Sequence, residues 1–189
     1  MVENLIEKYV TNSKKNFWDG SPFNRLLKLG IDERGKLGEE LVCQLLRAYT
    51  ILTCIWDGDK NTSRKDGTIW DIFIQIFESE IKTAMRGSSV ATWQHEKIVQ
   101  EQVWKKIVFV DFDYRGIWFT VQNYSDIPFE KQTHKILGKK STKCKGGWKF
   151  DLTIKHILTL EKLGYSFYYD VNNPDLQGFK KFFELHFSN

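Results

Sequence analysis

The chain has 189 residues, of which 41% are hydrophobic, 28% charged and 15% aromatic, with a formal net charge of +4. This composition is ordinary for a globular protein, and so small a net charge does not by itself indicate nucleic acid. Cys43, Cys54 and Cys144 are scattered and form no CxxC pair, so neither a disulfide framework nor a zinc site is expected. Because no signal peptide or long apolar run is recognised, the chain is expected to be cytoplasmic, with no membrane partner.

The first half of the chain alternates predicted helices and strands. Two short helices are expected between residue 2 and about residue 30, with a break at 16–22. Apolar residues spaced for one face predict a helix from about 36 to 49. A strand over 50–56, a polar loop over 57–67 and further strand-forming residues over 69–84 follow.

The second half of the chain continues the alternation. A helix is predicted from about 91 to 105, followed by a hairpin of 107–113 and 116–122. Residues 125–150 are expected to be irregular, and a helix (153–163), a strand (165–171) and a helix (175–187) close the chain. This order predicts one α/β (α+β) domain over 1–189, with a central mixed β-sheet flanked by helices.

The residues that indicate chemistry are Asp71, Glu80 and Lys82. Strand alternation places the charges of Glu80 and Lys82 on one face, with Ile81 toward the core. A carboxylate beside an ammonium suits a phosphate site, because the carboxylate can hold a hard cation and the lysine can meet phosphate charge. A surface ion pair on an exposed strand face is the alternative.

Asp71 can join Glu80 only if the chain reverses between them. On one straight strand the two residues would stand roughly 30 Å apart, too far to share a metal ion. The reversal is therefore expected near residues 75–78, although no Gly, Pro, Asn or Asp marks it.

Three segments support a more specific interpretation: GKLGEELVCQLL (35–46), DGTIWDIFI (66–74) and EIKTA (80–84). Together they resemble the PD-(D/E)xK nuclease superfamily, and within it the type II restriction endonucleases. The segments are similar to the opening Gly-Glu helix, the acidic strand entry and the end of the catalytic strand of that family. Trp70 stands where the family has a proline, and the motifs cover roughly residues 35–84.

The resemblance implies a restriction-endonuclease-like fold and a set of roles. Asp71, Glu80 and the carbonyl of Ile81 would hold one or two Mg²⁺ ions, and Lys82 would be the catalytic lysine. Glu39 would be an additional acid that orients the metal or its water. Glu40 falls with Gln44 on the solvent side of the helix, so a favourable charge in the first helical turn explains it.

Candidate DNA contacts lie outside these motifs. TWQHEKIV (92–99) resembles a segment that follows the catalytic strand in some restriction enzymes, where Gln94 and His95 would touch phosphate or the attacking water. A polar helix start is the alternative for both. In the polar loop, Lys60 and Arg64 are expected to form one edge of a DNA cleft.

A second group of candidate DNA contacts lies in a lysine-rich insertion at about 125–150. From Lys131 to Lys149 the chain has seven lysines and no acid. Phosphate or guanine contacts are expected there, the alternative being a solvated loop. The expected contacts are Lys139, Lys140, Lys143, Lys145 and Lys149.

The expected function is therefore Mg²⁺-dependent, site-specific cleavage of double-stranded DNA to leave 5′-phosphates, by a homodimer whose two sites cut opposite strands. A repair, junction-resolving or nicking nuclease of the same superfamily is one alternative, and a non-catalytic DNA-binding module is another. GKKST (138–142) resembles the end of a P-loop but lacks the upstream glycine, so no nucleotide cofactor is expected.

Overall fold

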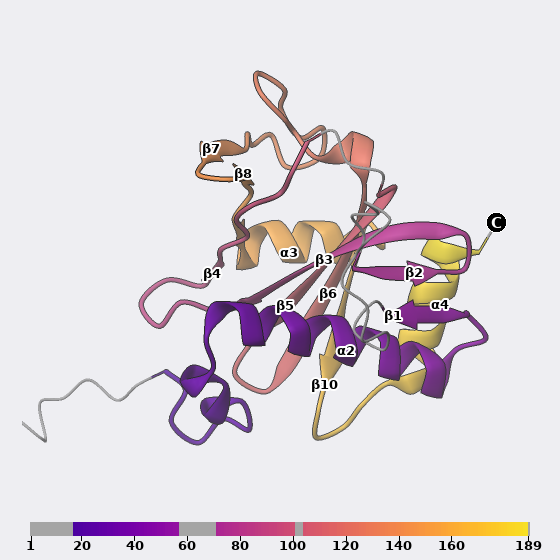
Figure 1. Ribbon diagram of the computed structural model, residues 1–189. Coiled ribbons are helices and arrows are strands. Elements are labelled where there is room, and N and C mark those ends of the chain that lie inside the picture. The colour runs from indigo at the N-terminus through magenta and orange to yellow at the C-terminus, as the bar shows by residue number, and fades with distance from the viewer. Residues whose placement is uncertain (1–16, 57–70, 101–103, 189) are drawn as a thin grey trace, which may run out of the picture.

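The computed structural model describes residues 17–56, 71–100 and 104–188, and its centre is a mixed six-stranded sheet (Figure 1). The strands stand in the order β1-β2-β3-β5-β6-β10. Their bounds are β1 (Cys54–Trp56), β2 (Ile72–Ile74), β3 (Phe77–Met85), β5 (Lys106–Phe112), β6 (Gly116–Asn123) and β10 (Ser166–Asp170). Because β3 and β5 pair in parallel and the other neighbours pair antiparallel, the predicted mixed sheet is confirmed.

Helices cover both faces of this sheet. The helices α2 (Ile31–Tyr49) and α4 (Leu176–Phe187) pack on one face, and α3 (Ile154–Lys162) packs on the other (Figure 1). Two short 3-10 helices, η1 (Asn24–Lys28) and η3 (Tyr124–Asp126), lie outside these layers. None of the helices in the described ranges has the length and apolarity needed to cross a membrane.

Two small sheets lie beside the central one. The first pairs β4 (Thr92–Trp93) with β9 (Leu152–Thr153), and the second pairs β7 (Thr142–Cys144) with β8 (Gly147–Lys149). A single bridge joins Ile98 to Trp148. The region after β3 is therefore tied to the lysine-rich region by backbone hydrogen bonds.

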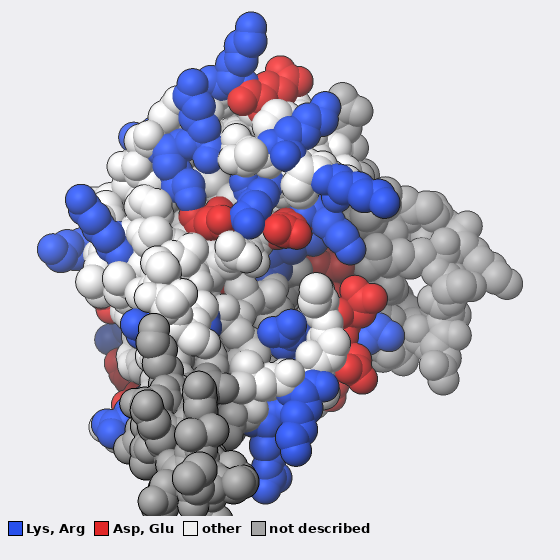
Figure 2. Space-filling view, turned by 90° about the vertical axis from the view of Figure 1, so that its left-hand side faces the viewer, with Lys and Arg blue, Asp and Glu red and all other residues white. Residues whose placement is uncertain are grey.

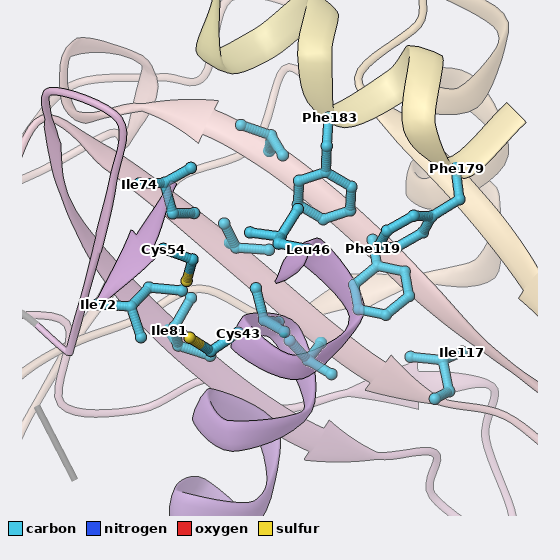
Figure 3. Close-up of a cluster of buried hydrophobic side chains, with 14 of the residues drawn as sticks. Cys43, Leu46, Cys54, Ile72, Ile74, Ile81, Ile117, Phe119, Phe179 and Phe183 are labelled. Carbon is cyan, nitrogen blue, oxygen red and sulfur yellow. The ribbon is translucent and has the colours of Figure 1, made fainter. Parts of the chain in front are cut away.

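The core is divided by the sheet into two apolar layers. On the α2 side, Leu46, Phe119 and Phe183 point toward one another (Figure 3). On the α3 side, Phe109 and Ile157 belong to the second buried cluster. Since each such side chain contributes about 1.5–3 kcal/mol when fully buried, these layers fix the sheet that carries the candidate site.

The segment after β3 differs from the prediction. A helix is expected over 91–105, but residues 91–100 form no helix and contain β4, while 101–103 lie outside the described residues. Trp93 and Ile98 are buried, and the Trp93 indole donates to the Phe112 carbonyl at 2.8 Å. These tertiary contacts outweigh the weak local preference for helix.

Other boundaries also shift. The helix α2 begins at Ile31 rather than near residue 36, because the Gly30 amide donates to the Glu33 carboxylate at 2.7 Å and caps the helix start. The second predicted N-terminal helix is only the 3-10 turn η1, and the first falls outside the described residues. The predicted strand over 50–56 shortens to Cys54–Trp56.

Candidate active-site cleft

A two-residue hairpin brings Asp71 back beside the strand that carries Glu80. The register pairs Ile72 with Ser79 and Ile74 with Phe77, so the chain turns at residues 75–76. Gln75 has φ 55°, the left-handed conformation that such a tight hairpin turn requires. The Asp71 amide donates to the Ser79 carbonyl at 3.0 Å, one residue out of the β2–β3 register, so Asp71 stays beside β3 just before β2 begins. The predicted reversal near residue 75 is confirmed.

Oxygen atoms gather at the edge of β3 beyond the end of β2. The Ile81 amide donates to the Asp71 Oδ2 at 2.7 Å. Because the N–H and C=O of one strand residue point to the same side, the Ile81 carbonyl also points toward this edge. No described strand pairs with Ile81 there, since the partner strand β2 begins at Ile72.

Glu80 and Lys82 share the opposite face from Ile81. The Ile81 side chain is buried in the α2-side core. The Lys82 Nζ lies 2.5 Å from the Glu80 Oε1, with side-chain exposures of 21% and 11%. This confirms the alternation predicted for the tripeptide, and it shows that the pair is largely withdrawn from water.

The helix α2 supplies Glu39 to the same region. Glu39 follows the buried Gly38, at which α2 lies directly against Thr83 of β3. The Glu39 Oε2 accepts a hydrogen bond from the Trp56 Nε1 at 3.1 Å. Glu40 instead accepts from the Gln44 amide at 2.7 Å on the exposed side, as the helical periodicity predicts. Trp56 is a contact that no sequence motif indicates.

A cleft of about 1040 Å³ joins these parts. One wall is formed by α2, the floor by β3, and the other wall by the extended segment after it. The lining includes five predicted site residues: Glu39, Asp71, Lys82, Gln94 and His95. It also includes three basic residues that were not predicted: Arg34, Lys36 and Lys97. Glu80 does not line the cleft itself, and its carboxylate is held by Lys82. A separate hollow of about 640 Å³ beside Arg25 and Arg115 contains none of the predicted residues.

The donors at the β3 edge fit Mg²⁺. Asp71 and the Ile81 carbonyl offer hard oxygen atoms at this edge, and Glu80, which is paired with Lys82 on the neighbouring face, is the second carboxylate of the set. Mg²⁺ typically takes one or two carboxylates and keeps several waters. No three His, Cys, Asp or Glu side chains converge as a metal-binding group among the residues described. The donor set therefore suits a hydrated Mg²⁺ ion better than zinc, which prefers three or four nitrogen or sulfur ligands.

His95 lies beneath the cleft with an acidic partner, Asp111, that sequence reasoning missed. Asp111 on β5 is in register with Ala84 on β3, and so it faces the same side as Lys82. The His95 Nε2 lies 3.0 Å from the Asp111 Oδ1, and both side chains are completely buried. Burial raises the pKa of Asp111, and the neighbouring His95 counteracts part of that effect. Gln94, by contrast, is exposed.

The lysine-rich segment is ordered around the β7–β8 hairpin and divides into two kinds of lysine. Lys139 donates to the Asp151 carbonyl and lies over the Phe150 ring, and burial lowers its pKa. Lys149 pairs with Glu96 at 3.3 Å and with Asp151.

The other predicted lysines of this segment face solvent. Lys140, Lys143 and Lys145 are exposed, and basic side chains gather over this part of the surface (Figure 2). Lys60 and Arg64 lie outside the described residues. The exposed lysines are therefore the ones that a ligand can reach without breaking internal contacts.

Comparisons with known proteins find no matching family model, no matching curated protein and no matching solved structure. The resemblance to PD-(D/E)xK nucleases therefore rests on the sequence motifs.

Proposed function

We propose that the chain is a Mg²⁺-dependent endonuclease for double-stranded DNA, with a restriction-endonuclease-like fold and a cytoplasmic location. The observation that carries the proposal is the β2–β3 hairpin, which returns Asp71 to the edge of β3 and brings its carboxylate to the amide of Ile81, the residue after Glu80, at 2.7 Å. On one straight strand, the Asp71 carboxylate could not reach a backbone amide beside Glu80. The hairpin therefore supports an active site over a surface ion pair.

The roles follow from the donors at the edge of β3. Asp71, Glu80 and the Ile81 carbonyl would hold one or two Mg²⁺ ions. A bound Mg²⁺ ion supplies a Lewis acid that lowers the pKa of a coordinated water and offsets phosphate charge. Lys82 brings a positive charge to the same face, where it can stabilise negative charge that builds on the phosphate during hydrolysis. Glu39, whose carboxylate accepts a hydrogen bond from the Trp56 indole, would orient the attacking water.

The β7–β8 hairpin supports double-stranded DNA as the substrate. A two-stranded ribbon fits the major groove, and its exposed lysines, Lys143 and Lys145, can meet phosphates or guanine edges there. The ribbon is joined to the wall of the cleft through the Ile98–Trp148 bridge. Recognition and cleavage would thus be mechanically connected, as a site-specific enzyme requires.

The proposed enzyme is of the type II restriction class and acts as a homodimer, leaving 5′-phosphates. Two copies of one active site are needed because each site hydrolyses one strand. A repair, junction-resolving or nicking enzyme would use the same site on one strand or on a branched duplex.

The test is digestion of a mapped supercoiled plasmid with Mg²⁺, beside a sample that contains EDTA. Discrete linear fragments that appear only with Mg²⁺ would support a site-specific endonuclease. Open circles alone, or a preference for branched over linear DNA, would favour the nicking or junction-resolving alternative. Binding of the plasmid without cleavage under any condition would favour a non-catalytic DNA-binding module.

A further inference from the structure

Lys97 belongs to none of the motifs, yet it lines the cleft together with Asp71 and Lys82. Its φ is 55°, in the left-handed region that residues with a side chain rarely adopt. Gln75 and Glu130 are the other non-glycine residues with positive φ in the described ranges. An exposed lysine held in such a conformation requires a structural cause and is a candidate for function.

The cause is a set of contacts on both sides of Lys97. The Ile98 amide donates to the Trp148 carbonyl at 2.9 Å, and the Trp148 amide donates back at 2.8 Å. The His95 carbonyl accepts from the Phe150 amide at 2.9 Å. Backbone hydrogen bonds from β8 and from Phe150, the residue after it, therefore hold the chain on both sides of Lys97 and impose the bend there.

Gly147 allows β8 to approach the chain at Ile98 closely enough for these hydrogen bonds. A Cβ on Gly147 would lie 2.7 Å from the Ile98 carbonyl oxygen, which real side chains do not tolerate. A Cβ on Gly146 would lie 3.8 Å from the Lys97 Cγ, so the Lys97 stem passes the tip of the β7–β8 hairpin. Lys97 is thus the point at which the hairpin meets the cleft.

The ammonium of Lys97 forms no ion pair with Glu96, its neighbour in the chain. Glu96 pairs with Lys149 at 3.3 Å. None of the ion pairs formed within the described ranges involves Lys97. Lys97 therefore adds positive charge to the cleft that Lys82 also lines, next to the tip of the hairpin that carries Lys145.

We propose that Lys97 is a phosphate-binding residue that joins the cleft to the lysine hairpin, so that the DNA backbone passes from Lys82 along Lys97 to Lys145. This inference rests on the proposed function, because it assigns a binding residue to the same site. The bend at Lys97 fixes the direction in which its side chain leaves the backbone. A fixed direction favours one path of the DNA backbone across the protein over other paths.

The test measures binding of a fluorescein-labelled duplex of mixed sequence by anisotropy, in EDTA and over a series of salt concentrations. The variants are Lys97→Gly, Lys97→Gln and Lys97→Arg, and the control is Glu130→Gly, which makes the same backbone change at an exposed residue that does not line the cleft. Thermal unfolding is followed for each. Because glycine relaxes a positive φ, both glycine variants are expected to be at least as stable as the wild type.

Lys97→Gly and Lys97→Gln are expected to bind several-fold more weakly, and their plots of log binding constant against log salt concentration should be shallower by about one unit. Lys97→Arg and Glu130→Gly should keep the wild-type slope. If Lys97→Gly and Lys97→Gln both keep the wild-type affinity and slope while the wild type still cuts plasmid, this inference is overturned. The proposed function would then still stand. A wild type that neither binds nor cuts DNA would overturn both.

Discussion

Gly38 of α2 meets Thr83 of β3 so closely that no larger residue fits between them, because a Cβ on Gly38 would overlap the Thr83 Oγ1. This contact sets how near α2 lies to β3. Glu39 follows Gly38 directly, and Lys82 precedes Thr83 directly. The distance between helix and strand therefore determines whether Glu39 can reach the same cleft as Lys82.

Gly38→Ala is expected to lower both stability and DNA cleavage. The added methyl must push α2 away from β3, and overpacking of this kind costs about 1–3 kcal/mol. Gly35→Ala on the same helix is the matched control, because a Cβ at Gly35 meets nothing within 4 Å. That control should gain up to about 1 kcal/mol from helix propensity and keep its cleavage rate. Chemical denaturation and initial cleavage rates measure both. Equal effects of the two substitutions would contradict the role given to Gly38.

Trp56→Phe should slow cleavage by freeing Glu39. Phenylalanine keeps most of the ring but removes the Nε1 that donates to the Glu39 Oε2 at 3.1 Å. A lost hydrogen bond to a charged group is worth about 1.5–3 kcal/mol, so a drop in kcat of roughly tenfold or more is expected, with little change in KM.

A double-mutant cycle separates positioning from a general effect of Trp56 on the fold. In a Glu39→Gln background, Trp56→Phe should change kcat much less, because the carboxylate that Trp56 orients is already gone. If the effects of the two substitutions on the logarithm of kcat simply add, Trp56 acts on cleavage by another route.

Acidification should destabilise the fold through His134. Its Nδ1 accepts from the Ile136 and Leu137 amides at 3.3 and 3.2 Å, so its Nε2 carries the proton that is donated to Gln122 at 3.1 Å. Burial is the main cause that lowers the pKa of His134 from 6.5. A lowered folded pKa means that the stability is present above 6.5 and is lost as pH falls toward the folded value.

The measurement is the free energy of unfolding between pH 7.5 and pH 5. Each extra proton bound by the unfolded chain adds about 1.4 kcal/mol per pH unit to the slope. His134→Asn should lower the stability at neutral pH and make the slope shallower. Part of the slope should remain, because burial also lowers the pKa of His156 and His186. A variant with the full wild-type slope would exclude His134 as a source.

Much of the sheet and one half of the site follow from local patterns in the sequence. The hairpin of β5 and β6, the helices α3 and α4, and the shared face of Glu80 and Lys82 depend on alternation, periodicity and capping residues close in the chain. The reversal at Gln75 follows from distance alone, since Asp71 and Glu80 could not otherwise meet. Its turn residue was not predictable, because glutamine has no preference for a positive φ.

The rest depends on contacts between residues far apart in the chain. Residues 91–100 are held in a non-helical conformation by Phe112 and Trp148, and no local signal in TWQHEKIV indicates partners so far along the chain. Trp56, Asp111 and Lys97 are missed for the same reason. Their contacts lie on other elements: Trp56 donates to Glu39 on α2, Asp111 pairs with His95 after β4, and Ile98, the residue after Lys97, bonds to Trp148 on β8.

The central claim is that Asp71 and Glu80 together form a Mg²⁺-dependent nuclease site, and the most direct test is plasmid cleavage by Glu80→Gln beside Glu78→Gln. Glu78 lies two residues earlier on the same face of β3, in register with Phe73. With Mg²⁺ present and folding verified by thermal unfolding, Glu80→Gln should lose at least about a hundredfold in rate. Glu78→Gln should cut like the wild type. Equal cleavage by the wild type and Glu80→Gln, or cleavage that persists in EDTA, would contradict the account.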